Sequence, residues 1–386
     1  MNIIFYCQYV WGMGHLVRSL EFARALSDHE VTLVAGGQDV QLDLPAHVNF
    51  VRLPTLYMDE QFTTLISGDP GKTVEQVQRA RRRILHGLFK RQQPDIFIVE
   101  LYPFGRSMFG FELDPLLEDI RGGKFGNVKT VCSLRVILVE KKDPAAFENR
   151  VLKKLNTGFD PLLVHSDGSL LPLDDTFARV ADIDIPVIYT GFITRQGNPA
   201  AGQRLRRELG IAPGQKLIVA SAGGGRSGHR LMTAVLDACR LLHDRLPVRL
   251  EAFAGPFMEE HEYKSLGARS GPGLRVRRYT KRFVDYLWAA DLSVSLAGYN
   301  TCMDLLSTGV PALVCPYSRQ QEQPLRVEKI KNFLPLRILS ENDLDPVGLS
   351  DDMAQMLSRT RRPGPAPLDL DGARQAAGFL NRWADT

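Results

Sequence analysis

A single histidine follows the first apolar run of the chain, at a position where its side chain could transfer a proton. Asn2 to Cys7 has the length and composition of a buried strand, and Gly12, Gly14 and His15 come soon after it. An imidazole at the carboxyl end of a strand can act as a general base, because its ordinary pKa is close to neutral pH. A histidine that caps or packs against the next helix is the alternative, and the sequence leaves both open.

A second stretch that could form a functional site runs from 292 to 316. Its pattern predicts a strand, a glycine turn, a helix and a second strand. Gly298 permits a sharp turn, and Asn300 or Thr301 could cap the helix. Thr301 and Asp304 have the spacing of a capping box. A helix N-terminus delivered to the end of a strand predicts an anion site, because its N–H groups and positive dipole end meet there. An ordinary βαβ unit without a ligand is the alternative.

Two glycine-rich loops do not match the P-loop or the dinucleotide-binding fingerprint. The loop over 223–228 has the glycine spacing of a P-loop, but His229 and Arg230 replace the lysine and hydroxyl residue that would hold phosphate and magnesium. Its glycines could still offer backbone N–H groups to a phosphate. The opening loop has Val17 at the third glycine site of the dinucleotide fingerprint, which weakens a nicotinamide-enzyme interpretation.

The composition is that of a globular protein without nucleic acid as a partner. The chain has 386 residues, enough for two ordinary domains, and 44% of them are hydrophobic. A net charge of +4 is small for this length, whereas nucleic-acid-binding domains carry a concentrated basic surface. The five cysteines include no CxxC pair, which favours a reduced, intracellular protein over a disulfide framework or a zinc knuckle.

The N-terminus and the apolar runs predict a cytoplasmic protein. No apolar run approaches the length of a membrane span. The first residues lack the basic region of a signal peptide, and glycines interrupt their apolar start, so we expect a first strand there.

Alternation of apolar runs and amphipathic stretches predicts a doubly wound α/β architecture in two domains. A segment rich in Gly, Pro and Gln over 191–203 predicts the boundary, and the βα pattern restarts after it. Strands are expected at 2–7, 31–35, 96–100, 130–136, 162–165, 186–190, 216–221, 248–254, 274–279 and 293–296, and helices at 16–27, 73–91, 231–242, 282–290 and 371–384.

The helix expected over 73–91 is amphipathic and basic on its outer faces. Its cationic residues are Arg79, Arg82, Arg83, Lys90 and Arg91. Such a helix can lie on an anionic membrane surface, which would make 79–91 a peripheral membrane contact. A solvated helix lying on the sheet is the alternative.

Five features stand in an order that resembles the GT-B glycosyltransferases. They are the Gly-Met-Gly-His loop, the glycine-rich loop, Ala-Gly-Tyr-Asn-Thr over 297–301, Gly-Val-Pro over 309–311 and Glu322-Gln323. The nearest likeness is to the lipid-linked N-acetylglucosaminyl transferase of peptidoglycan synthesis, with its glycosyltransferase family 28 type C-terminal domain. The likeness covers most of the second half and the first forty residues.

The resemblance implies a fold and an activity. The fold would be two Rossmann-like domains facing a cleft, an acceptor domain over 1–192 and a donor domain over 193–386. The last helix, about 371–384, would cross back to the first domain. The implied activity is transfer of a sugar from a nucleotide diphosphate, commonly a UDP-sugar, which is a substrate and not a cofactor.

The resemblance also implies donor-binding residues, carried over position by position. The phosphate contacts fall on Gly298, Tyr299, Asn300 and Thr301, and a linker arginine near the diphosphate falls on Arg195. The ribose contact falls on Asp304, one methylene shorter than the family's usual glutamate, and the sugar contact on Gln323. The donor loop falls on Gly224, Gly225 and Arg226, and the base-binding main chain on Tyr279 and Thr280.

On the acceptor side we assign His15 as the general base, next to Gly14. Glu100 is the second candidate base, because it ends a predicted strand. Tyr9, Val10 and Trp11 make the opening loop bulkier than the family's and could line an apolar acceptor site. A single displacement would invert the anomeric centre, and fixed donors would meet the leaving-group charge without a metal.

Two other functions stay open at this stage. A sugar-nucleotide epimerase of the same fold would convert the donor without an acceptor. A non-catalytic nucleotide-sugar or glycan binding protein would convert nothing. The acceptor itself is unknown; a lipid-linked one would bring a cytoplasmic chain to the inner face of the membrane.

Overall fold

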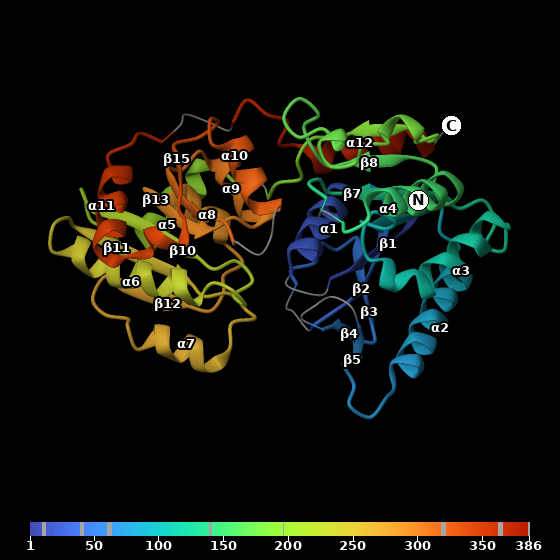
Figure 1. Ribbon diagram of the computed structural model, residues 1–386, viewed down its shortest axis with the longest axis horizontal. Coiled ribbons are helices and arrows are strands. Elements are labelled where there is room, and N and C mark those ends of the chain that lie inside the picture. The colour runs from blue at the N-terminus through green and yellow to red at the C-terminus, as the bar shows by residue number, and fades with distance from the viewer. Residues whose placement is uncertain are drawn as a thin grey trace. The chain divides into compact units, whose positions relative to one another are not determined.

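The computed structural model describes residues 1–9, 13–38, 42–59, 64–138, 141–195, 197–317, 322–361 and 366–384. The chain divides into two compact units, each built on a parallel sheet (Figure 1). The first unit comprises 1–193 and 371–386, and the second unit comprises 194–370. Within the described residues, no helix is long and apolar enough to cross a membrane.

The first unit contains a seven-stranded parallel sheet in the order β3-β2-β1-β6-β7-β8-β9. Its strands are mostly buried apolar runs, as expected for a parallel sheet covered on both faces. They are β1 (Asn2–Gln8), β2 (Glu30–Gly36), β3 (Val48–Leu53), β6 (Ile96–Glu100), β7 (Lys129–Leu134), β8 (Leu162–Val164) and β9 (Val187–Tyr189). A separate antiparallel pair consists of β4 (Leu56–Met58) and β5 (Leu65–Ser67).

The helices of the first unit are α1 (Gly14–Ala25), α2 (Val74–Gln92), α3 (Gly110–Arg121), α4 (Pro144–Gly158) and α12 (Gly372–Ala384), with short 3-10 turns η1 (Ser107–Phe109), η2 (Leu173–Asp175) and η3 (Val180–Asp182). The last helix, α12, packs on α1, the first helix of the chain (Figure 1). Ala376 and Leu380 of α12 join a core cluster with Leu16 and Leu20 of α1.

The second unit contains a six-stranded parallel sheet in the order β12-β11-β10-β13-β14-β15. The strands are β10 (Lys216–Ser221), β11 (Val248–Phe253), β12 (Leu274–Arg277), β13 (Leu292–Leu296), β14 (Ala312–Cys315) and β15 (Leu336–Ile338). The helices are α5 (Pro199–Glu208), α6 (His229–His243), α7 (Glu260–Gly267), α8 (Phe283–Ala289), α9 (Tyr299–Thr308), α10 (Glu322–Ile330) and α11 (Pro346–Leu357), with the turn η4 (Glu341–Leu344).

The strand order reverses once in the centre of each sheet. In the first unit the reversal falls between β1 and β6, and in the second unit between β10 and β13. Loops that leave neighbouring strands on either side of a reversal diverge, and open α/β sheets bind ligands at that edge. The loops after these four strands are therefore the places to look for a functional site.

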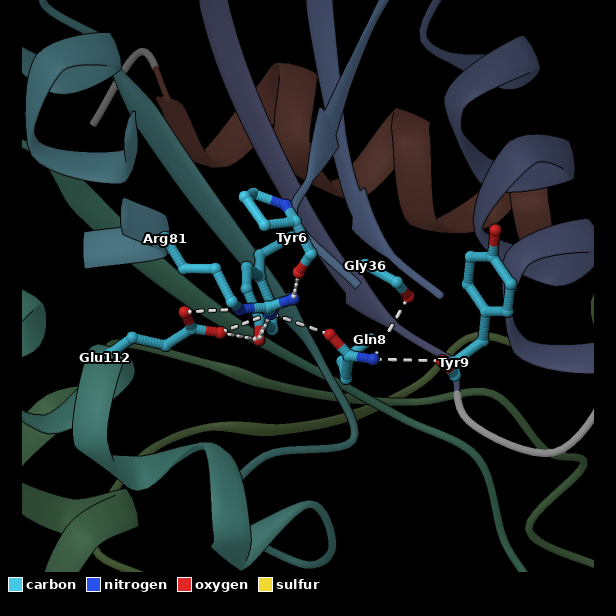
Figure 2. Close-up of polar contacts among 7 residues, drawn as sticks. Tyr6, Gln8, Tyr9, Gly36, Arg81 and Glu112 are labelled. Carbon is cyan, nitrogen blue, oxygen red and sulfur yellow. Dashed lines mark hydrogen bonds and ion pairs between the residues drawn. The ribbon is translucent and has the colours of Figure 1, made fainter. Parts of the chain in front are cut away.

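A buried ion pair ties the strands of the first unit to two of its helices (Figure 2). Arg81 of α2 is fully buried and donates from Nε to Glu112 Oε2 of α3 at 2.9 Å, and from Nη2 to Oε1 at 2.6 Å. The same guanidinium donates to Gln8 Oε1 at 2.7 Å. The Gln8 amide donates to the carbonyl oxygens of Tyr9 and Gly36. Arg81 thereby fixes the carboxyl ends of β1 and β2, where the first loop begins.

Candidate functional site

The residues of interest in the first unit lie at the reversal between β1 and β6. His15 is the second residue of α1, the helix that follows β1, and Glu100 is the last residue of β6. Their side chains meet, with His15 Nδ1 2.7 Å from Glu100 Oε1. Glu100 is buried, whereas 18% of the His15 side chain is exposed. The two candidate bases of the acceptor side are thus one hydrogen-bonded pair.

The charge on Glu100 determines the tautomer of His15. Burial by itself raises the pKa of this carboxyl, but the charges of His15 and Arg18 outweigh burial and lower the pKa to about 2. Arg18 forms an ion pair with the same oxygen, Oε1. A carboxylate oxygen at 2.7 Å can only accept, so Nδ1 of His15 carries the proton and Nε2 carries the lone pair. Arg18 Nη2 is farther from Nδ1, at 3.3 Å.

His15 is ready to accept a proton at neutral pH. Burial lowers the pKa of its imidazole to about 4, and the neighbouring Glu100 only partly opposes that effect. The ring is therefore neutral at pH 7. A neutral imidazole with a buried carboxylate on Nδ1 can accept a proton at Nε2, and the carboxylate stabilises the imidazolium that forms.

The remaining acceptor-side assignments are only partly covered by the structure. Gly14 begins α1 directly before His15. Trp11 lies outside the described residues, as does Val10. Tyr9 is buried, and its hydroxyl donates to the carbonyl oxygen of Gln38.

The glycine turn of the second unit lies at the reversal between β10 and β13. Gly298 is the N-cap of α9, in an extended conformation with φ −61° and ψ 149°, and as a glycine it has no side chain to cap the helix. The expectation that Asn300 or Thr301 caps it, with a capping box to Asp304, is wrong. The helix begins at Tyr299, so Thr301 already lies within the first turn and Asp304 in the second.

Asp304 instead forms an ion pair with Arg195. The guanidinium is bidentate, with Nε donating to Oδ1 at 3.2 Å and Nη2 donating to Oδ2. Burial raises the pKa of the Asp304 carboxyl, and the charge of Arg195 opposes that rise. The Arg195 guanidinium also lies 5.5 Å from the centre of the Phe283 ring. Two positions assigned to the donor from sequence are therefore in direct contact.

The glycine-rich loop follows β10, the strand next to β13. Gly225 has φ +101°, and a Cβ atom there would lie 2.7 Å from the carbonyl oxygen of Ala254. Only glycine permits both this backbone conformation and this close approach. Arg226 is exposed, and its guanidinium lies 5.9 Å from the centre of the Phe257 ring. Gly224 accepts a hydrogen bond at its carbonyl oxygen from Phe257 N at 2.9 Å.

Two further donor-side assignments have local partners. Thr280 Oγ1 accepts from Arg282 N at 3.1 Å, just before α8. Gln323 is buried at the start of α10, and its Oε1 accepts from Tyr317 N at 2.9 Å. The α10 helix begins at Glu322, so Gln323 is its second residue.

Two arginines beside the expected residues were not singled out from sequence. Arg18 lies three residues after His15 on α1, and Arg326 lies three residues after Gln323 on α10. Arg326 is fully buried and donates to the carbonyl oxygen of Ala297, directly before the glycine turn, at 3.3 Å. The helical spacing of three was the available signal, because such residues share a helix face.

No group of three or more His, Cys, Asp or Glu side chains in the described part of the chain has the arrangement of a metal site. The five cysteines are buried free thiols.

Comparison with known proteins agrees with the resemblance inferred from the motifs. Residues 219–369 match the glycosyltransferase family 28 C-terminal domain. The calicheamicin glycosyltransferase CalG4 has a similar structure, with a TM-score of 0.60, 14% sequence identity, and coverage of 99% of this chain and 96% of that one. The predicted GT-B fold and the family likeness of the second half are confirmed.

Two curated relatives are similar over part of their length. An uncharacterized glycosyltransferase of Methanopyrus kandleri, MK0977, is 23% identical over 239 residues, 60% of this chain and 65% of its own. The UDP-N-acetylglucosamine–N-acetylmuramyl-(pentapeptide) pyrophosphoryl-undecaprenol N-acetylglucosamine transferase of Acetivibrio thermocellus is 24% identical over 170 residues, 42% of this chain and 46% of its own. This chain thus matches less than two thirds of the length of each relative.

Proposed function

We propose that this chain, whose second unit carries a glycosyltransferase family 28 C-terminal domain, transfers a sugar from a nucleotide diphosphate to an acceptor hydroxyl. One observation carries the proposal. The His15–Glu100 pair and the turn from Gly298 to Asp304 each lie at the strand-order reversal of their own sheet. The first location offers a general base, and the second offers backbone N–H donors beside a buried carboxylate. Sugar transfer requires a base for the acceptor hydroxyl and hydrogen-bond donors for the leaving diphosphate.

The first unit would bind and activate the acceptor. His15 Nε2 takes the hydroxyl proton while the acceptor oxygen attacks the anomeric carbon. The bond from that carbon to the diphosphate breaks, and the nucleoside diphosphate leaves with the electron pair. Glu100, paired with Nδ1, stabilises the imidazolium. A single displacement of this kind inverts the anomeric carbon.

The second unit would bind the donor and stabilise the leaving group. The first turn of α9 and the glycine-rich loop direct backbone N–H groups to one edge of the sheet, where negative charge grows as the diphosphate leaves. Arg195 adds a cation there. Asp304 would accept hydrogen bonds from the ribose hydroxyls, so donor binding would compete with the Arg195 ion pair. The proposal assigns no step to a metal.

A uridine nucleotide is the proposed donor. The Acetivibrio thermocellus relative is named for UDP-N-acetylglucosamine, and its acceptor is a lipid-linked pyrophosphate. We extend the nucleotide to this chain and leave the sugar open.

A thermal-shift screen across nucleoside diphosphates and UDP-sugars tests the proposal. UDP and one UDP-sugar should raise the melting temperature in a concentration-dependent way, because a ligand of the native state stabilises it. Failure of every nucleotide to raise it would contradict the proposal. Conversion of a UDP-sugar without an acceptor would favour the epimerase, and binding without any conversion would favour the non-catalytic protein.

We also propose a peripheral membrane contact at the cytoplasmic face, through α2. Its outward basic residues are exposed and form no ion pair within the described part of the chain: Arg79, Arg82, Arg83, Lys90 and Arg91. A groove of about 500 Å³ lies beside Arg79, Arg82 and Arg83 and is also lined by His86 and Pro115. The chain should pellet with anionic vesicles and be released by salt. Sedimentation that persists after all five are changed to Gln would rule out this contact.

A further inference from the structure

A third arginine beside the His15–Glu100 pair has no role in the mechanism above. Arg106 belongs to the loop that leaves β6, six residues after Glu100. It is the N-cap of η1 and has a left-handed backbone, with φ 58° and ψ 26°. The loop is held to the sheet by Leu101, whose N–H donates to the Ser133 carbonyl at 2.8 Å. Arg106 therefore has a fixed position at the edge of the sheet that presents His15.

The guanidinium of Arg106 is desolvated but not neutralised. Its Nε atom is buried and has no hydrogen-bond acceptor, and no ion pair forms to this side chain within the described part of the chain. The charge of the Glu100 carboxylate acts on it, but Glu100 is already paired with Arg18. The residue as a whole stays partly exposed, so a ligand can reach it.

The surroundings of Arg106 add positive charge. Arg135 follows the end of β7, the neighbour of β6 in the sheet. Burial lowers the pKa of Arg106, Glu100 partly opposes that effect, and the charge of Arg135 adds to the lowering. A desolvated cation without an ion-pair partner costs free energy, and an oxyanion that accepts hydrogen bonds from the guanidinium removes that cost.

We propose that Arg106 is a binding residue for an oxyanion carried by the acceptor, a phosphate or a carboxylate. The inference rests on the proposed function, because it assigns a group of the acceptor in that reaction. The residues on which it depends all belong to the first unit. The cation and the base lie on one edge of one sheet, so an acceptor held by its anionic group at Arg106 presents a nearby hydroxyl to His15.

The donor diphosphate is the competing source of an oxyanion, and the experiment must distinguish the two. The probe is inorganic phosphate, added to the full chain with the donor site filled by saturating UDP. The readout is the NMR signal of the Arg106 side-chain Nε–H, assigned by its loss in Arg106→Lys. Acetate replaces phosphate in a second titration.

We expect a saturable shift of this signal with half-saturation below roughly 10 mM phosphate, unchanged by UDP. Arg106→Met should weaken phosphate binding, measured by calorimetry, by roughly 10- to 150-fold, the range for a lost hydrogen bond to a charged group. Lys153→Met removes an exposed cation from the same unit and should change the phosphate affinity less than twofold. A larger response to acetate than to phosphate would indicate a carboxylate acceptor.

Three results would overturn the inference: no saturable shift with either anion, loss of the shift when UDP is present, or an equal effect of Lys153→Met. If Arg106→Met does not fold, the wild-type titration with and without UDP still decides. Phosphate binding together with an absence of sugar transfer would reject the proposed function and leave the anion site standing. Sugar transfer without anion binding would reject the anion site and leave the proposed function standing.

Discussion

The two units have the same arrangement of central strands and different chemistry at the edge where the order reverses. In the first unit, titratable side chains meet there: His15 from α1 and Glu100 from β6. In the second unit the edge is made of glycine turns and a helix N-terminus, and the buried carboxylate of Asp304 there is already paired with a cation. The same topology thus supplies a tuned base in one sheet and backbone donors in the other.

This difference matches what each proposed task requires. Proton transfer needs a group whose pKa the protein can set, and burial together with a neighbouring charge sets it for His15. Phosphate binding needs several donors at close range, which glycine makes possible because backbone can approach backbone, as at Gly225. The comparison predicts that substitutions in the first unit act on turnover and substitutions in the second unit act on donor affinity.

The largest expected effect is on turnover. His15→Ala should lower kcat by about 10²- to 10⁴-fold, the usual contribution of a general base. Donor affinity should stay within about twofold, because the residues proposed to bind the donor belong to the second unit. Steady-state kinetics with a UDP-sugar and calorimetry with UDP measure the two quantities. His243→Ala, at an exposed histidine of α6, is the matched control. Turnover within a few-fold of the wild type would remove His15 as the base.

The next effect is on donor binding. Asp304→Asn should weaken UDP binding by about 1–3 kcal/mol, since hydrogen bonds from the ribose to a charged acceptor are lost. The same change leaves Arg195 without its counter-charge, so the melting temperature should also fall. Asp244→Asn, at an exposed position, serves as the control. Unchanged UDP affinity with a lower melting temperature would mean that Asp304 has only a structural role.

At neutral pH the smallest effect concerns His165 of the first unit, because its influence on stability grows only as the pH falls. His165 is fully buried between Ser133 Oγ, 2.7 Å from Nε2, and Thr190 Oγ1, 2.8 Å from Nδ1. Burial lowers its pKa to about 3. The unfolded chain therefore binds a proton at this residue below pH 6.5 while the folded chain does not, so the free energy of unfolding falls as the pH falls from about 6.5 toward 3.

The free energy of unfolding should change less steeply with pH in His165→Gln. The difference should be up to about 1.4 kcal/mol per pH unit, the value for one proton. Urea unfolding at pH 7, 6, 5 and 4 measures it. A slope that is the same in the variant and the wild type would show that His165 titrates alike in the folded and unfolded chain.

Much of the fold was predictable because buried parallel strands are apolar runs with turn residues at their ends. The β10 strand has the predicted bounds, and β6 was expected over the same residues. The elements missed include β3, α3 and α4 in the first unit and α7, β15 and α11 in the second. The α3 helix begins at Gly110 and contains Pro115, residues that usually interrupt a helix. The signal for α4 was present, with Asp143 as N-cap and Pro144 in the first turn.

The candidate site was predictable as a set of residues but not as a set of contacts. His15 and Glu100 are 85 residues apart in the chain, and Arg195 and Asp304 are 109 apart. Such pairs depend on which strands are neighbours, and strand order cannot be read from hydrophobic periodicity. The mistaken capping box had a local cause. Gly298 itself is the N-cap, so the residues that matched the motif lie inside the helix.

The central claim is that the first unit determines turnover and the second unit binds the donor. It is tested most directly by measuring UDP affinity and kcat on four proteins: the wild type, His15→Ala, Asp304→Asn and the double variant. The account predicts that His15→Ala changes kcat alone and that Asp304→Asn weakens UDP binding. The UDP affinity of the double variant should match that of Asp304→Asn within about 0.5 kcal/mol, because the substituted sites belong to separate units. A loss of UDP affinity in His15→Ala as large as that in Asp304→Asn would contradict the account.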